Sequence, residues 1–274
     1  MIFDGSSAGS HPATTFRGPA QHTISQFLVE HRAKPVRSTG QRVLGRSPLG
    51  ETDARWYWAA VGQLELKSRL EQLGAEWTVV HGVPGPSETI DHLVIGPGGV
   101  FTISAHDHAR QRVWVSGRAF VADGHRLPYL RQAEEAIGHV ERTLETVGGV
   151  HLRASTVIAV IDPGSLQVRD LPRDVFVVRA DSLTEWLKTR DAVLGAETAA
   201  HVASLARIEA TWTTEPRSVA DVELIARERA EFDVVQREVA TARLVRSAWA
   251  VGVITLLAGM MLAVGLLQWT RLTS

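Results

Sequence analysis

The sequence predicts an α/β (α+β) domain in which helices flank a mixed β-sheet, followed by a charged helix and one C-terminal apolar helix. Short β-branched runs alternate with amphipathic stripes between about residues 54 and 190, which indicates strands and covering helices. The run 96–99, Gly-Pro-Gly-Gly, lies between two such runs and predicts a hairpin. Residues 248–269 carry no charge, which predicts the apolar helix.

Composition limits the classes of protein to which the chain can belong. The 274 residues are 45% hydrophobic and 22% charged, as in globular proteins, with some apolar excess that is local to the C-terminal region. The formal charge of -1 gives no overall electrostatic case for nucleic acid. The chain has no cysteine, which excludes disulfides, thiolate zinc sites and a cysteine nucleophile.

Residues 1–50 are rich in Gly, Ser, Pro, His and Arg and have little apolar periodicity. We expect a mostly disordered N-terminal tail, with one short helix around residues 24–29 and no cleaved secretory signal. Several basic residues cluster in this region. We interpret them as part of a solubilising tail, with contact to phosphate or anionic lipid as the alternative: Arg32, Lys34, Arg37, Arg42 and Arg46.

The main domain is expected at residues 54–190. A helix from Asp53 to Gly74 would bury a stripe that includes the amide of Gln63. A second long helix at 128–147 and a short helix starting at 182–187 would complete the helical cover. Strands are expected at 77–83, 90–95, 100–104, 112–115, 119–123, 156–161 and 175–178.

Polar residues on the expected hairpin suggest a site. Because strand side chains alternate between faces, Thr102, Ser104 and His106 should share one face, and Ile103 and Ala105 should share the other. Asp91 and His92 open the preceding strand, so a carboxylate, imidazoles and a hydroxyl group could meet at one end of the sheet.

Residues 191–246 are expected to form a helical juxtamembrane region. Within it, residues 219–246 are highly charged and carry a narrow apolar seam: Val222, Ile225, Phe232, Val235, Val239 and Ala242. Such a seam can pair two copies of the chain in a homo-dimer or lie against the domain, and the sequence favours neither.

Residues 248–269 are predicted to be a transmembrane helix. About 22 residues at about 1.5 Å rise span about 33 Å, enough for a bilayer core of about 30 Å. Trp249 and Trp269 lie at the ends, where interfacial aromatic residues belong. The short tail 270–274 makes this a tail anchor. Arg243 and Arg246 outnumber Arg271, which predicts a single-pass membrane protein with its folded domain in the cytoplasm.

Two segments carry a family resemblance: residues 58–63 (WAAVGQ) and residues 90–101 (IDHLVIGPGGVF), followed by the helix at 128–144. They resemble the nuclease-related domain, NERD, in its membrane-associated form, over about residues 54–190. The resemblance implies a restriction-endonuclease-like fold, in which a helical glutamate, a strand aspartate and a Glu-x-Lys pair surround a divalent metal.

The functional positions of the family are mostly substituted. Asp91 matches the aspartate, Gln63 stands at the helical glutamate, and Ser104 and His106 stand at the Glu-x-Lys pair. Mg²⁺ needs hard carboxylate ligands, and only Asp91 remains. We therefore expect a catalytically inactive nuclease-like domain with no cofactor, acting in nucleic-acid binding or regulation. The arginines expected to contact nucleic acid are Arg110, Arg112, Arg118, Arg126 and Arg131.

Four alternatives stay open. The domain could be an active nuclease that binds Mg²⁺ or a transition metal through Asp91 and His106. It could be a Ser-His-Asp hydrolase that uses Ser104, His106 and Asp91, although no nucleophile elbow accompanies them. The arginines could be a solvated edge, because acidic residues are interspersed. The protein could instead be a membrane scaffold that recruits a protein partner.

Overall fold

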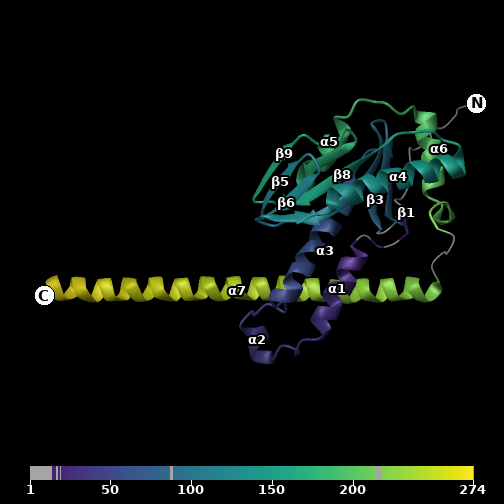
Figure 1. Cartoon of the computed structure of the whole chain (residues 1–274). Helices are drawn as coiled ribbons and strands as arrows, with labels where there is room; N and C mark the ends of the chain where they lie inside the picture. Colours follow the sequence, from purple (N-terminus) through teal and green to yellow (C-terminus); the bar gives the residue numbers. More distant parts are fainter. Residues whose placement is uncertain (1–13, 17, 19, 87–88, 214–217, 274) are drawn as a thin grey trace, which may run out of the picture. The chain divides into compact units, whose positions relative to one another are not determined.

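The computed structural model describes residues 14–16, 18, 20–86, 89–213 and 218–273, and the side chains only as far as residue 261. The chain forms two compact units (Figure 1). The first unit contains residues 1–23 and 57–222, and the second contains residues 24–56 and 223–274. The expected boundaries at 54 and 190 differ from these, because residues 14–23 and 191–222 belong to the first unit.

A six-stranded mixed sheet forms the centre of the first unit. Its strand order is β1-β2-β3-β4-β8-β10. The β2–β3 and β3–β4 pairs are antiparallel, whereas β1–β2, β4–β8 and β8–β10 are parallel. This confirms the mixed α/β class. The strands are β1 (Thr14–Thr15), β2 (Thr78–Val83), β3 (Ile90–Gly96), β4 (Gly99–Asp107), β8 (Ala154–Ile161) and β10 (Val175–Arg179).

Helices cover both faces of this sheet (Figure 1). On one face, α4 (Tyr129–Gly148) and α6 (Ala196–Ala206) bury apolar side chains against Leu93 and Val100. On the other face, α3 (Glu51–Leu70) and α5 (Leu183–Lys188) pack against Phe101 and Ile103. Two short 3₁₀ helices, η1 (Ala180–Ser182) and η2 (Glu209–Thr211), complete the unit. The strand alternation predicted for β4 is therefore confirmed.

The glycine-rich turn forms the expected hairpin between β3 and β4. Gly96 pairs with Gly99, which has a positive φ of 123° that glycine adopts without strain. The Trp77 ring lies against Gly96 so closely that an added Cβ would be 2.2 Å from its Cε3. Val193 N–H donates a hydrogen bond to the Pro97 carbonyl at 2.9 Å, so the turn is held from outside as well.

A second sheet was not predicted as a separate element. It has four strands in the order β7-β6-β5-β9. These are β5 (Arg112–Ser116), β6 (Ala119–Ala122), β7 (His125–Leu127) and β9 (Ser165–Arg169). Val113, Val115 and Phe120 are buried on its inner side together with Val160 of β8. The sequence reasoning missed β9 and β7, since neither contains an apolar run.

The expected disorder of residues 1–50 is wrong for residues 21–43. Helices α1 (Gln21–Arg32) and α2 (Thr39–Val43) form there, and residues 1–13 lie outside the described part. Ile24, Phe27 and Leu28 are buried, which gives α1 the apolar stripe that holds a helix in place. The Phe27 ring meets the Phe232 ring edge-to-face at 5.3 Å.

Asp53, at the start of α3, is fully buried in the second unit. Its carboxylate accepts hydrogen bonds from Gly50 N–H at 2.7 Å, from the His31 ring at 2.8 Å and from Lys34 Nζ. Burial alone would raise the pKa of Asp53, but these three donors together hold that pKa below its ordinary value of 3.8. The loop between α1 and α3 is thereby tied to one carboxylate.

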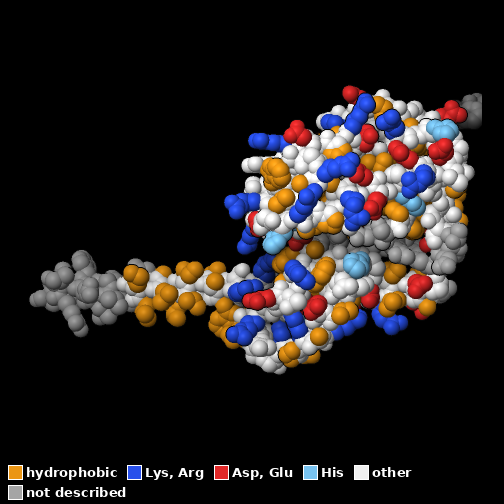
Figure 2. Space-filling model, viewed as in Figure 1, with side chains coloured by type: hydrophobic (Ala, Val, Ile, Leu, Met, Phe, Trp, Pro, Cys, Tyr) orange, Lys and Arg blue, Asp and Glu red, His pale blue; other side chains and the backbone are white. Residues whose placement is uncertain are grey.

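The charged helix and the apolar helix of the sequence are one continuous helix, α7 (Val219–Thr273). Among the described residues, α7 is the one helix that is both long enough and apolar enough to cross a membrane. Its most apolar 18-residue stretch has a mean hydropathy of 1.7 and contains no buried residue. Figure 2 shows hydrophobic side chains on this stretch. In the charged part, Phe232, Val235, Val239 and Ala242 of the expected seam are buried within the chain.

Candidate functional site

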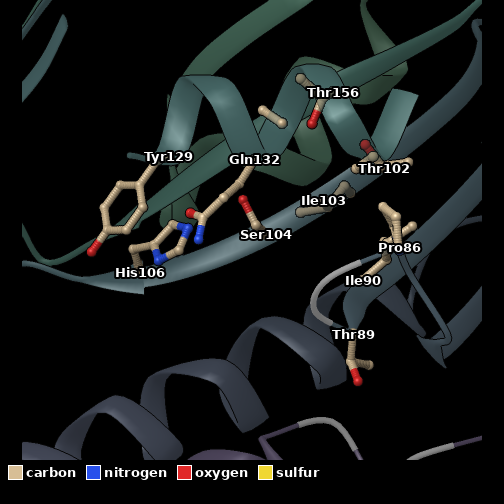
Figure 3. A pocket seen from close by; sticks show the side chains of 12 residues that line it. Pro86, Thr89, Ile90, Thr102, Ile103, Ser104, His106, Tyr129, Gln132 and Thr156 are labelled. Carbon is tan, nitrogen blue, oxygen red and sulfur yellow. The ribbon is translucent and has the colours of Figure 1, made fainter. Parts of the chain in front are cut away.

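The residues expected to form one site lie on opposite faces of the sheet. Ser104 and His106 point toward α4, where they line a pocket together with Tyr129 and Gln132 (Figure 3). Gln63 lies on α3, the helix that covers the other face. The four family positions therefore do not surround one common point, although Gln63 and Asp91 do converge.

Gln63 and Asp91 converge on the backbone of Ala105. Asp91 Oδ2 accepts a hydrogen bond from Ala105 N–H at 2.9 Å. Gln63 Nε2 donates to the Ala105 carbonyl oxygen at 3.2 Å, and Gln63 Oε1 accepts from the Thr23 hydroxyl at 2.9 Å. We call this arrangement the Ala105 clamp. The last β3–β4 pair is His92 with Ile103, so side chains satisfy the peptide groups where the strand pairing has stopped.

The Ala105 clamp disfavours a divalent metal at this point. A hard cation beside Asp91 would need further oxygen ligands, and the Ala105 carbonyl is the kind of ligand that Mg²⁺ or Ca²⁺ accepts. That oxygen instead receives an N–H group from Gln63. Among the described residues, no group of three or more His, Asp or Glu side chains is arranged to hold a metal ion.

His106 is held by an aromatic stack. Its ring lies 3.6 Å from the Tyr129 ring at an interplanar angle of 13°. Burial, followed by the nearby His108, lowers the pKa of His106 to about 3. The imidazole is thus neutral at physiological pH and cannot replace the ammonium group that the family carries at this position.

The described residues do not show the contacts that a Ser-His-Asp hydrolase depends on. Neither a Ser104–His106 nor a His106–Asp91 hydrogen bond is present among them, whereas a hydrolase of this type needs both contacts. Asp91 bonds the Ala105 backbone, whereas the His106 ring stacks on Tyr129.

The pocket beside Ser104 has a cavity volume of about 60 Å³. The described residues that line it offer hydroxyl, amide and imidazole groups but no carboxylate, lysine or arginine. Thr102 contributes a hydroxyl oxygen that is buried and has no hydrogen-bond partner within the described structure. Neutral groups of this kind suit small polar molecules better than a metal or a phosphate.

The sequence places His92 beside Asp91 but does not predict its pairing with a second buried histidine, His81. His81 Nδ1 and His92 Nδ1 are 2.7 Å apart across the β2–β3 pair, and both side chains are fully buried. Burial lowers the pKa of His81 to about 4 and holds that of His92 well below 6.5. One proton therefore joins two neutral rings. The signal was present in the sequence, since both histidines interrupt apolar strands, but only the strand register pairs them.

The arginines proposed for nucleic acid lie at the second sheet. Arg112 is exposed on β5, Arg110 precedes that strand, and Arg118 lies in the turn that follows it. Trp114, two residues after Arg112 on the same face, is 42% exposed. Strand pairing adds two further exposed arginines to this face. Trp114 lies opposite Val121, which pairs with Arg126, and Ser116 lies opposite Arg169.

We call this exposed face the tryptophan-arginine face; it consists of Arg112, Trp114, Arg126 and Arg169. The sequence predicted Arg112 and Arg126 as nucleic-acid contacts but not Trp114 or Arg169, and Arg169 joins this face only through strand pairing. Arg126 Nη2 also donates to the Arg118 carbonyl at 3.3 Å, which links β7 to the β5–β6 turn.

Comparison with known proteins agrees with this architecture. No curated protein and no solved structure matches the chain. One family model does match, and it covers α3 from residue 58 onward, β2, the hairpin, the second sheet except β9, α4 and β8. Residues 58–161 match the nuclease-related domain family, NERD, which confirms the resemblance of this part of the chain to that family.

Proposed function

We propose that this is a membrane-anchored, nuclease-related protein that binds single-stranded nucleic acid without cleaving it. The observation that carries the proposal is the tryptophan-arginine face. An exposed indole provides a stacking surface for a base, and guanidinium groups around it can contact the phosphates. Sheet surfaces that combine aromatic and basic groups bind single strands with little sequence preference.

The Ala105 clamp and the neutral His106 support the second half of the proposal. Phosphodiester hydrolysis in this kind of fold requires a metal held by carboxylates and a charged group near the attacked phosphate. In this chain the Asp91 carboxylate accepts a hydrogen bond from Ala105 N–H. Gln63 donates an amide N–H group to the Ala105 carbonyl oxygen, where a glutamate would offer a metal-binding oxygen. A nuclease assay of the full chain with Mg²⁺ and with Mn²⁺ should show no cleavage, and cleavage that disappears in Asp91→Ala would refute inactivity.

Binding can be measured by fluorescence anisotropy with labelled single-stranded DNA and RNA oligomers and the full chain in neutral detergent. Affinity should fall as salt rises from about 50 to about 200 mM, since the arginines displace counterions from phosphate. Trp114→Ala should weaken binding about 5-fold or more, because one stacked base is worth about 1–3 kcal/mol.

A matched control is available on the same unit. Trp58 is 41% exposed, close to the value for Trp114, but lies on α3. Trp58→Ala should leave the affinity unchanged, while Arg112→Gln and Arg169→Gln should each lower it. Equal losses in the two tryptophan variants, or an affinity that does not depend on salt, would contradict the proposal.

A further inference from the structure

The segment 37–46 packs against α7 where its uncharged stretch begins. Gly45 lies so close to the helix that an added Cβ would be 2.6 Å from Arg246 N and 2.8 Å from the Ala242 carbonyl oxygen. Trp249 Nε1 donates to the Val43 carbonyl oxygen at 2.8 Å. We call residues 37–46 and 242–249 together the basic collar.

Short-range contacts give the collar a defined structure. Ser38 and Gln41 form a reciprocal capping box at the start of α2, with bonds of 3.0 and 3.3 Å. Arg37 donates to the Arg46 carbonyl at 2.7 Å and to Glu238 at 2.5 Å. Residues 37–46 are thus an ordered part of the second unit. The expectation that their arginines belong to a solubilising tail is wrong.

The collar is strongly basic. It contains five arginines and no acidic residue, namely Arg37, Arg42, Arg46, Arg243 and Arg246. Arg42, Arg46 and Arg246 are exposed, and none of them forms an ion pair within the described part of the chain. Figure 2 shows basic side chains where the uncharged stretch of α7 begins. Three guanidinium groups are therefore available for an external anion.

Apolar side chains accompany these arginines. Val43 is 57% exposed, Leu44 61% and Trp249 52%. A surface in water alone rarely places so many exposed apolar groups beside unpaired cations. At the boundary of a bilayer the same combination is favourable, since indole and aliphatic groups enter the interface while guanidinium groups meet the head groups.

A groove beside the collar has the size of a lipid head group. Its volume is about 360 Å³ and it is lined by Arg37, Arg42, Val234, Arg237, Glu238, Thr241 and Ala242. At about 1.5 Å per residue, Ala242 lies about 9 Å before Ala248, where the uncharged stretch starts. The head-group region is about 5–8 Å deep on each side of a bilayer, so the end of the groove at Ala242 comes near it.

We propose that the basic collar binds the phosphate head groups of anionic phospholipids in the leaflet next to the folded units. The inference rests on the membrane anchorage proposed above. A lipid explains the apolar side chains and the position beside the span, which a soluble phosphate ligand would not. Each arginine close to an anionic leaflet contributes a preference of about fivefold, corresponding to about 1 kcal/mol.

The test uses the full chain in nanodiscs that contain equal amounts of phosphatidylcholine and phosphatidylglycerol, followed by mass spectrometry of the lipids that remain bound after transfer to detergent. The parent chain should retain phosphatidylglycerol at least about fivefold over phosphatidylcholine. The triple variant R42Q/R46Q/R246Q should retain the two lipids about equally, whereas R42K/R46K/R246K should keep the preference.

The matched control removes three positive charges at exposed positions outside the collar. R153Q/R173Q/R227Q changes three arginines that are exposed and lie outside both the collar and the tryptophan-arginine face, and it should retain the preference of the parent. Added glycerol 3-phosphate should not displace the lipid. No preference in the parent, an unchanged preference in the collar variant, or displacement by glycerol 3-phosphate would each overturn the inference. Failure of the parent to enter nanodiscs of any composition would instead refute the anchorage.

Discussion

At the scale of single residues, two of the four positions that match a nuclease site form hydrogen bonds to the backbone. Asp91 and Gln63 satisfy the two peptide groups of Ala105 where β3 stops pairing with β4. A buried peptide group left without a partner costs about 1–3 kcal/mol. Asp91 therefore has a structural role at the end of the β3–β4 pairing.

Asp91→Ala should consequently destabilise the first unit by about 1–3 kcal/mol, since Ala105 N–H loses its acceptor. Gln63→Ala should cost a similar amount, and a double-mutant cycle should show coupling because both side chains bond the same residue. Chemical denaturation of the full chain in detergent measures these values. Asp191→Ala, an exposed control, should have little effect, and strict additivity of the two clamp variants would contradict a shared role.

Gln63→Glu should convert part of the clamp into a cation site. The new carboxylate cannot donate to the Ala105 carbonyl, so the melting temperature without metal should fall. Mn²⁺ should recover part of the loss, because two carboxylates and a carbonyl then offer oxygen ligands. Melting scans with and without Mn²⁺ test this, with Gln63→Leu as the variant that should not respond. Equal metal responses in the two variants would contradict the prediction.

His106 should make stability depend on pH. Its pKa is about 3 in the folded chain and ordinarily 6.5, so the unfolded chain binds the extra proton between these values. Stability is therefore complete above about pH 6.5 and declines as the pH falls toward 3. The loss between pH 7 and pH 5 should be about 2 kcal/mol from this residue.

His106→Phe keeps a ring against Tyr129 and removes the titration, so it should lose less stability than the parent between pH 7 and pH 5. Unfolding free energies at the two pH values measure the difference. His125→Phe, on the exposed strand β7, is the control and should behave like the parent. Identical pH dependence in His106→Phe and the parent would show that other groups, such as His81 and His92, account for it.

At the scale of elements, the sequence predicts the strands and helices that carry an apolar pattern. It does not predict strands that form only through pairing with a neighbouring strand. The runs at β2, β3, β4, β8 and β10 and the stripes of α3 and α4 are confirmed, because burial selects them locally. Strand β9 (Ser165–Arg169) is polar and exists through its parallel pairing with β5. Helix α1 (Gln21–Arg32) is longer than the six residues expected from the sequence, since its apolar stripe is short and its flanks resemble a linker.

The hairpin between β3 and β4 should be sensitive to the smallest added side chain. Gly96→Ala places a methyl group against the Trp77 ring, and the indole has to move out of its packing. We expect a loss of about 1–3 kcal/mol, as for other overpacked cores. Thermal unfolding followed by circular dichroism measures it.

Gly195→Ala is the matched control for that substitution. No atom lies within 4 Å of an added Cβ there, and the φ of −65° is acceptable for alanine. Its cost should stay below about 1 kcal/mol. Comparable losses in the two glycine variants would show that backbone freedom rather than contact with Trp77 sets the effect.

At the scale of the whole molecule, the candidate site was predicted in part. Gln63 lies on the expected helix, and Asp91 and Arg112 lie on expected strands, because apolar patterns predict these elements. That Ser104 and His106 face a different helix from Gln63 follows from the strand alternation. Alternation alone does not show which face of the sheet α3 covers. Arg169 joins the tryptophan-arginine face only through the sheet order, which no local pattern contains.

The orientation of the chain in the membrane can be tested with engineered thiols, because the native sequence has no cysteine. Ser47→Cys marks the folded side, next to the collar. We expect a membrane-impermeant maleimide to label it only after cell lysis, since Arg243 and Arg246 favour the cytoplasmic side. A cysteine at Ser274 should label in intact cells, and the reverse pattern would place the folded units outside.

Because α7 is one continuous helix, the number of residues between two of its positions sets the rotation between their side chains. Each residue turns the helix by about 100°, so one residue inserted between Ala242 and Trp249 would rotate the indole away from Val43 while Gly45 stayed in contact. Insertions of seven residues, close to two full turns, would return the indole to the same azimuth but shift it by about 10 Å along the axis. The collar therefore fixes rotation as well as depth, and this stretch cannot change in length without losing one or the other.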